Sequence, residues 1–491
     1  MRAAAANFDD EALRRCIAEA HAHGVKCYIT VNIMPSCRDL PALPAYLELL
    51  QDAGADAMIV ADVGVIRMAQ KYAPGVPLHI STQTSILNPE AANFWADMGA
   101  ERVVLARELS LEEIAEIRAK TPKSLEIEAF VHGAMCISYS GRCLISQYMT
   151  GRDANHGACA QPCRWKYSIV EEKRPGQYFP IEQTAEGAYL FNSQDMNMLA
   201  HIDDLLDSGA TSLKIEGRSK SAYYIAAMTN AYKTAVNEYM VQRGFEDADG
   251  NVLKPFRDRV IRPGDPEYCK PDTEDAIMAN ADGAFAGKPD IDAVPVGGVP
   301  SGNVSAGNVS SGNIAIGEPD NLSYHARSTR RKSNTAAEIL PEGWHHAGVR
   351  PAPHVTLPDW LLDEPDKVAH RDYSTGFYYP EHKVRQSTDR SAYFRAWLVV
   401  GEVLSWSPED GGRVTIMSRN KIEAGQEVEF VLPGAAPFAY TVPAGGFRDA
   451  DGHWVEAINN PAHVFSMPCP QEVPVNAAIR SRTKKPTLKA E

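Results

Sequence analysis

Several features that mark large classes of protein are missing from this chain of 491 residues. No apolar run approaches the ~18 residues of a membrane-spanning helix. The N-terminal segment shows no apolar core of the signal-peptide type before acidic residues appear at Asp9 and Asp10. The sequence therefore predicts a cytoplasmic protein with no membrane partner, in which disulfide bonds are not expected.

Net positive charge is missing as well. The formal net charge is −14, which argues against broad, nonspecific nucleic-acid binding because such binding requires a positive surface. Two local basic segments remain, residues 330–332 and a series near the C-terminus. We interpret the first as a solvated linker and the second as either a local nucleic-acid contact or a frayed terminus. The second series consists of Arg480, Arg482, Lys484, Lys485 and Lys489.

Signatures of hydrolases and of dinucleotide-binding enzymes are absent too. Neither H-E-x-x-H nor G-x-S-x-G occurs, so the sequence shows no recognisable metallopeptidase site or nucleophile elbow. No glycine-rich fingerprint follows any predicted strand, which counts against a doubly wound dinucleotide-binding sheet. Hydrolytic peptidase activity is therefore the weaker of two enzyme classes considered below.

What the chain does contain is a concentration of cysteine between residues 128 and 164. Four of the nine cysteines lie here, separated by six, fifteen and three residues and interleaved with glycine. Glycine permits the tight backbone turns that would bring such thiols together. The four cysteines are Cys136, Cys143, Cys159 and Cys163.

Three interpretations of these thiols are open. They could be inert, since free cysteine is often buried like a small hydrophobic residue. They could bind a structural zinc ion, although zinc sites favour pairs two to four residues apart and only the second pair fits. An iron–sulfur cluster also takes four thiolates and accepts irregular spacing, because its ligands come from loops around a larger object. We favour the cluster.

Apolar, β-rich segments alternate with amphipathic segments over residues 8–243. This alternation predicts a parallel sheet covered by helices on both faces. The predicted strands cover residues 25–34, 55–62, 77–85, 102–109, 125–133 and 211–218, and the predicted helices cover 9–23, 43–50, 64–72, 89–98, 111–119, 195–207 and 220–241.

Polar side chains gather in the C-terminal halves of these predicted strands. Convergence on one rim is the arrangement of a (β/α) barrel, which has a single mouth at that end. We therefore predict a TIM-like (β/α) barrel with these side chains around its mouth. The set consists of Asn32, Asp62, Ser81, Thr82, Gln83, Arg107, Glu108, His132, Lys214, Glu216 and Arg218.

A four-thiolate cluster beside such a rim suits redox chemistry on a charged small molecule. We predict that the catalytic residues are His132, Glu216 and Arg218, of which His132 and Glu216 are candidates for proton transfer. Basic and amide side chains are candidates for binding a carboxylate-bearing co-substrate, and these are Arg107, Lys214 and Gln83. The alternative is that Arg107–Glu108 and Lys214–Glu216 are ion pairs that brace the rim.

The alternation of strands and helices ends near residue 244. We predict three parts: a partial (β/α) barrel over 1–243, a low-complexity or disordered insertion over 244–345, and a C-terminal β-barrel over 346–485. The insertion is rich in Pro, Gly and Asp and holds the short repeat SGNVSAGNVSSGNIAIG at 301–317. Several short strand-like segments separated by turn residues indicate the small β-barrel.

Two segments carry a resemblance to a known family. E-x-F-x-H-G-x-x-C, beginning at Glu128, and S-G-R-C at 140–143 resemble the signature of the U32 family of collagenase-like peptidases. HRDYSTGFYY at 370–379 is similar to that family's H-R-x-Y-T-T-G-F segment. The resemblance implies that the four cysteines hold a [4Fe–4S] cluster. It also implies a barrel of eight strands, so with six we expect an N-terminally incomplete barrel whose strand at 25–34 has no partner on one side.

The resemblance also suggests an activity. Members of the family with a C-terminal domain support oxygen-independent formation of 5-hydroxyuridine at the tRNA wobble position and depend on prephenate. A sister group hydroxylates a cytidine of 23S rRNA, and shorter members hydroxylate the ubiquinone ring. The C-terminal domain is similar to the second domain of translation elongation factors, which suits RNA contact through residues such as Arg419 and Lys421. We expect tRNA or rRNA as partner, and either a homo-oligomer or a hetero-oligomer is compatible with the sequence.

Overall fold

The computed structural model describes residues 8–136, 138–165, 168–170, 175–176, 178–180, 193–218, 220–243, 268–269, 348–349, 354–381, 393–408, 411–449 and 451–487. The chain divides into one unit of Met1–Arg257 with Val355–Glu491 and a second unit of Asp258–His354. Almost all of the predicted insertion at 244–345 lies outside the described residues. The elements below belong to the first unit, apart from a two-residue pairing of β10 (Tyr268–Cys269) with β11 (Gly348–Val349) in the second.

All six strands predicted for the N-terminal half are present and form a parallel sheet. Successive strands pair in chain order, and the last pairs with β5. The sheet is thus built from strand–helix–strand units, as expected for apolar strands covered by helices. The strands are β1 (Tyr28–Val31), β2 (Ala57–Val60), β3 (Leu78–Ile80), β4 (Ala100–Val104), β5 (Glu126–Ala134) and β9 (Ser212–Ile215).

Two further strands join this sheet at β5. β8 (Asp195–Asn197) runs antiparallel to the carboxyl end of β5, and β12 (Tyr373–Ser374) runs parallel to β8. The β5 strand therefore pairs with β9 along its middle and with β8 at its end. The helix predicted over 195–207 is wrong in its first part, where β8 and η4 (Leu199–His201) precede α7 (Ile202–Asp207).

The described strands of the first sheet do not form a closed ring. Within the described ranges, β1 pairs with β2 alone and β9 pairs with β5 alone. The predicted (β/α) barrel is therefore confirmed as a parallel α/β sheet, and its closure into a TIM-like barrel is not confirmed.

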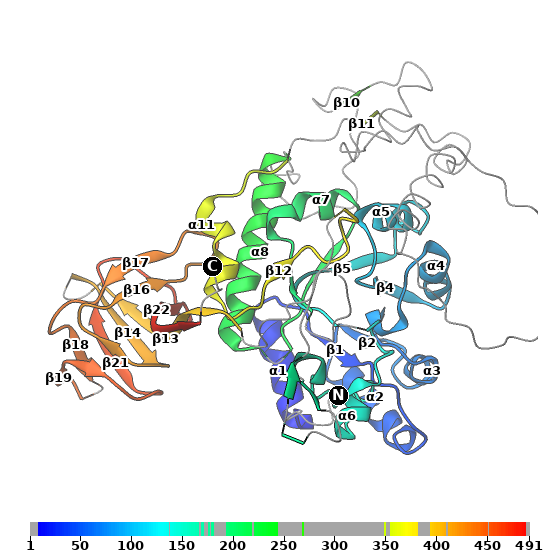
Figure 1. Ribbon diagram of the computed structural model, residues 1–491, viewed down its shortest axis with the longest axis horizontal. Coiled ribbons are helices and arrows are strands. Elements are labelled where there is room, and N and C mark those ends of the chain that lie inside the picture. Colours follow the sequence, from blue (N-terminus) through cyan, green and yellow to red (C-terminus); the bar gives the residue numbers. More distant parts are fainter. Residues whose placement is uncertain are drawn as a thin grey trace, which may run out of the picture. The chain divides into compact units, whose positions relative to one another are not determined.

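The helices begin where the sequence offers capping side chains. Asp9, Asp62, Asn88, Ser110 and Ser221 each accept a hydrogen bond from a backbone N–H of the following first turn. Helices α3, α4 and α5 lie along the outer side of the sheet (Figure 1). No helix in the described ranges combines the length and apolarity that crossing a bilayer demands. The helices are α1 (Asp10–Ala22), α2 (Leu43–Asp52), α3 (Val63–Tyr72), α4 (Pro89–Asp97), α5 (Leu111–Ala119) and α8 (Ala222–Gln242).

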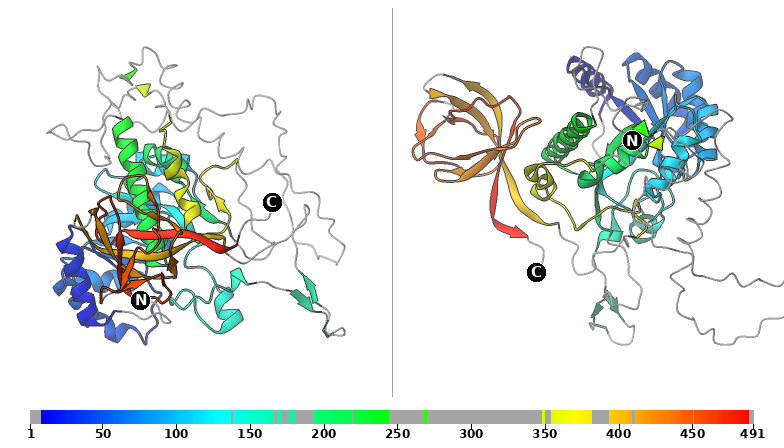
Figure 2. Two further views of the ribbon diagram at one scale, coloured as in Figure 1. Left: turned by 90° about the vertical axis from the view of Figure 1, so that its left-hand side faces the viewer. Right: turned by 90° about the horizontal axis from the view of Figure 1, so that it is seen from above.

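The C-terminal part is a curled antiparallel sheet, seen from two further directions in Figure 2. Its strand order is β17-β16-β22-β13-β14-β21-β18-β19, and β15 (Ile422–Glu423) pairs separately with β20 (Ala457–Ile458). The predicted β domain is thus confirmed as a curled sheet. The strands are β13 (Arg395–Ser407), β14 (Arg413–Ser418), β16 (Glu427–Phe430), β17 (Phe438–Thr441), β18 (Phe447–Asp449), β19 (Trp454–Val455), β21 (Val464–Pro468) and β22 (Ala478–Thr487).

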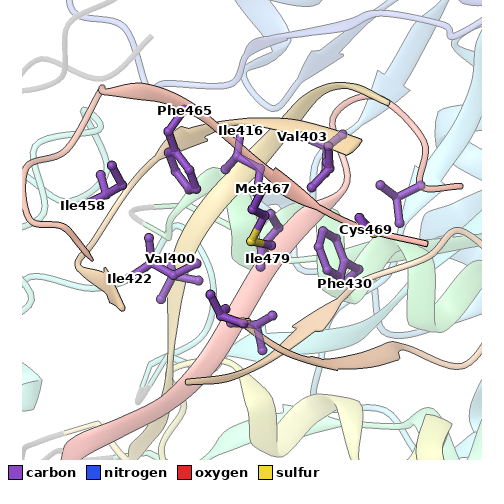
Figure 3. Close-up of a cluster of buried hydrophobic side chains, with 14 of the residues drawn as sticks. Val400, Val403, Ile416, Ile422, Phe430, Ile458, Phe465, Met467, Cys469 and Ile479 are labelled. Atoms are coloured by element: carbon purple, nitrogen blue, oxygen red, sulfur yellow. The ribbon is translucent and has the colours of Figure 1, made fainter. Parts of the chain in front are cut away.

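An apolar core fills the inside of this curled sheet (Figure 3). Alternate residues of each strand point inward: Val414 and Ile416 of β14 are buried, as are Phe465 and Met467 of β21. Phe447 packs edge-to-face on Phe465 with ring centroids 5.4 Å apart. Period-two burial leaves the intervening residues of β14, β21 and β18 on the outer face.

One prediction about charge is wrong. Arg480 belongs neither to a frayed terminus nor to an exposed basic patch, because it lies in β22 with 0% exposure. Its guanidinium donates to Glu364 at 2.6 and 2.7 Å and to Glu429 at 2.8 Å. Glu364 belongs to η5 (Glu364–Lys367), which precedes the β domain in the chain. A buried arginine needs such partners to offset its desolvation.

Candidate functional site

The cysteine segment begins at the carboxyl end of β5 and folds back on itself. Helix α6 (Ile145–Thr150) contacts the short helix η3 (Pro162–Arg164), which contains Cys163. The buried hydroxyl of Ser146 accepts a hydrogen bond from the Ala160 amide at 3.0 Å. The Asn155 side chain donates to the Cys143 carbonyl at 3.2 Å. These bonds bring the stretch around the second cysteine pair against the stretch that follows the first.

A glycine fixes this segment against the sheet. Gly141 has φ of +75°, and a Cβ atom there would lie 2.8 Å from the carbonyl oxygen of Gln83. Gln83 lies in η2 (Thr82–Thr84), directly after β3. The hydroxyl of Ser85 also donates to the Ser140 carbonyl at 3.3 Å. Only glycine combines this backbone conformation with so close an approach, so the segment is seated beside a predicted site residue.

All four thiols are at least partly accessible to solvent. Cys136 and Cys159 are exposed, and Cys143 and Cys163 are partly accessible, so inert burial does not describe them. The Gln161 amide donates to Cys159 Sγ at 3.3 Å, and hydrogen bonds to sulfur are a common feature of iron–sulfur sites. Groups of three or more ligand atoms within 4.8 Å of one another in the described ranges do not include these thiols. The donor set fits a four-thiolate cluster, whose presence stays a prediction.

Arg107 lies just beyond β4 and reaches the end of β5. Its guanidinium carbon sits 3.7 Å from the centre of the Phe130 ring, and Nη1 donates to the Ala134 carbonyl at 2.7 Å. Ala134 is two residues before Cys136. The structure therefore brings the predicted anion-binding arginine to the start of the cysteine segment. A guanidinium stacked on an aromatic ring is held in orientation while part of its hydrogen-bonding capacity stays available.

Glu216 is placed beside β5 by a second close approach. Gly133 has φ of +110°, and a Cβ atom there would collide with the Glu216 backbone. The Glu216 amide donates to the His132 carbonyl at 2.8 Å, and its Oε1 accepts from the Arg218 amide at 2.9 Å. The Arg218 side chain is exposed. The structure thus places Glu216 at the end of β5, next to the start of the cysteine segment.

Four predicted site residues share an unusual feature. Each has a buried side-chain atom with no hydrogen-bond partner within the described part of the chain. Buried polar atoms are nearly always paired, because leaving one unpaired costs about 1–3 kcal/mol. Other buried atoms without a partner occur away from these residues, at His79 and Asn93, so the four atoms are candidates for pairing with a bound ligand. The atoms are Gln83 Oε1, Arg107 Nε, His132 Nε2 and Glu216 Oε2.

Lys214 has a different partner from the one considered in the sequence. Its ammonium contacts Glu128 at 2.5 Å, and Glu128 also accepts from Arg102 at 3.0 Å and Ser212 at 2.9 Å. Burial alone would raise the pKa of Glu128, but Lys214 and its other partners hold that pKa below its ordinary value. The Lys214–Glu216 pairing is therefore wrong. The role of Lys214 in binding a substrate stays a prediction.

The other ion pair considered for the rim is also not found. Arg107 and Glu108 form no ion pair within 4.0 Å in the described ranges, and Arg107 contacts Phe130 and Ala134 instead. Burial raises the pKa of Glu108, which the charge of Arg107 partly offsets.

His132 is buried among tyrosines behind the rim. Its ring lies 5.5 Å from Tyr232, 5.8 Å from Tyr224 and 5.4 Å from Tyr373, and Nδ1 is 3.2 Å from the Tyr232 hydroxyl. Burial lowers the pKa of His132 to about 3, against an opposing effect of Asp195. This histidine is therefore neutral near pH 7. Its predicted part in proton transfer would have to use the neutral ring.

The sequence analysis did not predict a buried network that reaches His132 through Tyr373. Arg371 donates to Asp195 at 2.5 and 3.0 Å, and Lys220 lies 3.6 Å from the same carboxylate. His370 stacks on Tyr373 with ring centroids 4.4 Å apart. The H-R-x-Y segment was recognisable in the sequence, but nothing there indicated Asp195 as the partner of its arginine.

Comparisons with known proteins cover both parts of the chain. The family model described as Peptidase family U32 matches residues 1–270, and the model described as Peptidase family U32 C-terminal domain matches residues 395–480. The first match alone spans more than half of the chain.

Individual relatives give the same picture. The chain is 37% identical over 296 residues to "tRNA hydroxylation protein P" of Escherichia coli, covering 52% of this chain and 65% of that protein. It is 28% identical over 469 residues to "tRNA hydroxylation protein P1" of Bacillus subtilis, covering 94% of this chain and 83% of that one. It is 36% identical over 225 residues to "23S rRNA 5-hydroxycytidine C2501 synthase" of Escherichia coli, covering 46% and 33%.

Proposed function

Because this chain belongs to peptidase family U32, we propose that it takes part in the oxygen-independent hydroxylation of RNA, with the wobble uridine of tRNA as the target and 5-hydroxyuridine as the product. One observation carries the proposal. The similarity to the Bacillus subtilis tRNA hydroxylation protein extends over 94% of this chain. It therefore includes the α/β sheet, the cysteine segment and the C-terminal β domain together.

In this proposal Cys136, Cys143, Cys159 and Cys163 hold a [4Fe–4S] cluster. When bound there, the cluster supplies one-electron transfer at the carboxyl end of β5. The accessible thiols, the amide donor to Cys159 and the folded-back segment support this assignment. The close approach of Gly141 to Gln83 supports it further, because this contact holds in place the segment that carries the ligands.

The surrounding side chains would bind the co-substrate and accept protons. Arg107, oriented by Phe130 and Ala134, suits a carboxylate, and we propose prephenate as the co-substrate held there. The Gln83 amide, with an unpaired buried oxygen, would accept a hydrogen bond from the bound molecules. The Glu216 carboxylate has an unpaired buried oxygen beside β5 and would accept a hydrogen bond or a proton from the bound molecules.

Mass spectrometry of digested tRNA from a deletion strain tests this proposal. We expect 5-hydroxyuridine to disappear, the wild-type chain to restore it, and the Cys136→Ser and Glu216→Gln chains to fail. A Cys16→Ser chain is the matched control, because Cys16 lies on α1 outside the cysteine segment. Unchanged wobble uridine in the deletion strain would reject the proposal.

A second candidate target is ribosomal RNA. The similarity to the Escherichia coli 23S rRNA 5-hydroxycytidine synthase, at 36% identity over 225 residues, favours it. That match covers 46% of this chain, whereas the match to the Bacillus subtilis tRNA hydroxylation protein covers 94%, which is why we prefer tRNA. Loss of hydroxycytidine from digested 23S rRNA with unchanged tRNA would reverse the preference. An altered ubiquinone pool in the same deletion strain would support hydroxylation of the ubiquinone ring. Digestion of collagen by the purified chain would support peptidase activity.

A further inference from the structure

The outer face of the curled sheet carries an exposed tryptophan next to two arginines. Trp454 lies on β19, the last strand of the sheet, and its side chain is 58% exposed. The Arg448 guanidinium carbon is 4.6 Å from the centre of the indole, and that of Arg413 is 5.9 Å from it. Trp454 is thus a highly exposed aromatic side chain on the last strand of the described sheet, with two guanidinium groups close to its ring.

Strand register puts these side chains on the same face. Arg448 is directly opposite Trp454 across the β18–β19 pair and opposite Ser466 across the β18–β21 pair. Ser466 is in turn opposite Thr415, and Arg413 is two residues before Thr415 on β14. Since alternate residues share a face, all of these point away from the core. The outer face is therefore polar, with one aromatic platform at its edge.

The two arginines approach the indole from the sheet side. In the strand order β14-β21-β18-β19, both β14 and β18 lie on the same side of β19. Both guanidinium groups belong to strands on that side of the indole, and the 58% exposure of Trp454 leaves much of its side chain open to solvent. Cation–π contacts of this kind hold an indole in a defined orientation. Trp454 is thus presented with a solvent-facing aromatic surface and cationic groups beneath it.

Hydrogen bonds of Asp449 close the hairpin next to Trp454. Asp449 accepts hydrogen bonds from the amides of Asp451 at 3.0 Å and His453 at 2.8 Å. The backbone bond from His453 is the main reason that the pKa of Asp449 is lowered. Asp449 is opposite the buried Phe465, so it projects to the other side of the strand from Arg448. The nearest acidic side chain along β18 is therefore directed away from the platform.

We propose that the face formed by Trp454, Arg448 and Arg413 binds a single-stranded segment of RNA, with one base stacked on the indole and the neighbouring phosphates on the arginines. The choice of RNA rests on the proposed function. Stacking of bases on aromatic side chains beside arginine is how sequence-tolerant single-strand binding works. Charge complementarity favours a polyanion at this face, and the exposed planar ring favours one that carries bases.

Bulk charge contributes little to this binding. Residues 395–487 contain nine Lys and Arg and ten Asp and Glu, so the β domain has no overall positive field to attract RNA. Stacking should then supply most of the affinity, with a small number of phosphate contacts. A shallow dependence of the binding constant on salt is expected, corresponding to about two contacts with a slope of roughly −0.7 each for single strands.

Fluorescence anisotropy with a fluorescein-labelled oligouridine and the full chain tests the proposal. Trp454→Ala should weaken binding by roughly 5- to 100-fold, as loss of one stacked base predicts. Trp454→Phe should retain most of the affinity, and Arg448→Gln should reduce the salt slope by about 0.7. Val475→Ala is the matched control, because Val475 is also 58% exposed in the same domain. Melting temperatures of all variants confirm that they fold.

Three outcomes would overturn the proposal. These are unchanged oligouridine binding by the Trp454→Ala chain, equal binding of duplex RNA of the same length, or displacement of the RNA by polyglutamate with an affinity that depends on Trp454. The last would identify an acidic protein partner. Binding is measured without turnover, so its outcome does not depend on the proposed chemistry. Normal binding with unchanged tRNA in the deletion strain would reject the proposed function and leave this surface standing.

Discussion

Arg371 and Asp195 lie 176 residues apart in the sequence and form an ion pair at 2.5 Å, with side chains that are only 2% and 1% exposed. The arginine amide donates to the same carboxylate at 3.2 Å. The pair joins β8 to the segment that carries β12, and it lies behind the tyrosines around His132. It therefore fixes the segment that carries β12 to β8, next to the residues that surround His132.

Removing one member of this pair should be costly. We expect Arg371→Met to lower the free energy of unfolding by about 3–5 kcal/mol, because it leaves a buried carboxylate with Lys220 as its remaining charged neighbour at 3.6 Å. Urea unfolding followed by circular dichroism measures this. Lys120→Met, which breaks a helix-surface pair with Glu116, should cost less than about 0.5 kcal/mol. Equal losses for the two variants would contradict the interpretation.

Acid should act on His132 through the unfolded state. Burial lowers the pKa of this histidine to about 3 in the folded chain, against about 6.5 when unfolded. Above pH 6.5 neither state binds the proton, so there is no effect. As the pH falls from about 6.5 towards 3, only the unfolded state gains the proton, and this group lowers the free energy of unfolding by about 1.4 kcal/mol per pH unit.

Histidine NMR provides the direct measurement of this pKa. The His132 ring signal, assigned as the signal lost in His132→Gln, should keep a constant chemical shift down to about pH 4 in the folded protein. A titration centred near pH 6.5 would show that the ring is hydrated, contrary to its 1% exposure.

Seating of the cysteine segment depends on Gly141. We expect Gly141→Ala to displace the segment from Gln83 and to lower bound iron in anaerobically purified protein, because the new Cβ would lie 2.8 Å from the Gln83 carbonyl oxygen. Gly151→Ala is the matched control, since its φ is also positive, at +69°, but nothing lies within 4 Å of the added atom. It should cost about 1 kcal/mol of strain and retain its iron. Full iron content in Gly141→Ala would contradict this reading.

The four cysteines should bind iron as a unit. Wild-type protein purified without oxygen should contain about four irons per chain and absorb in the visible range, and Cys136→Ser should lose most of both. Cys16→Ser should keep them, because Cys16 lies on α1. Stoichiometric zinc in colourless wild-type protein would identify a structural zinc site instead.

The sequence was informative where a pattern repeats along the chain. The longer strands of the two sheets, such as β5 with nine residues and β13 with thirteen, carry a pattern that is readable in the sequence. β8 and β12 have three and two residues, too few for any periodicity. Their existence depends on pairing partners far away in the chain, which local propensity does not encode.

Among the site residues, too, some positions were predictable from the sequence and others were not. Gln83, Arg107 and Glu216 were predictable because parallel strands deliver their ends to one edge, and the structure does place them near the cysteine segment. The partners of charged residues were not predictable. Lys214 pairs with Glu128 across the sheet, and Arg480 pairs with Glu364, 116 residues away. Ion-pair partners depend on strand register and tertiary contacts, and neither can be recognised from the neighbouring residues in the sequence.

The burial of Arg480 bears on how the chain can be divided for expression. The family match to the C-terminal domain begins at residue 395, but Glu364, which receives two of the Arg480 hydrogen bonds, comes 31 positions earlier (395 − 364). A fragment cut at the family boundary would keep the arginine and discard its principal counter-ion. Fragments intended for crystallisation or RNA binding should therefore start ahead of Asp359, where the short helix leading to Glu364 begins.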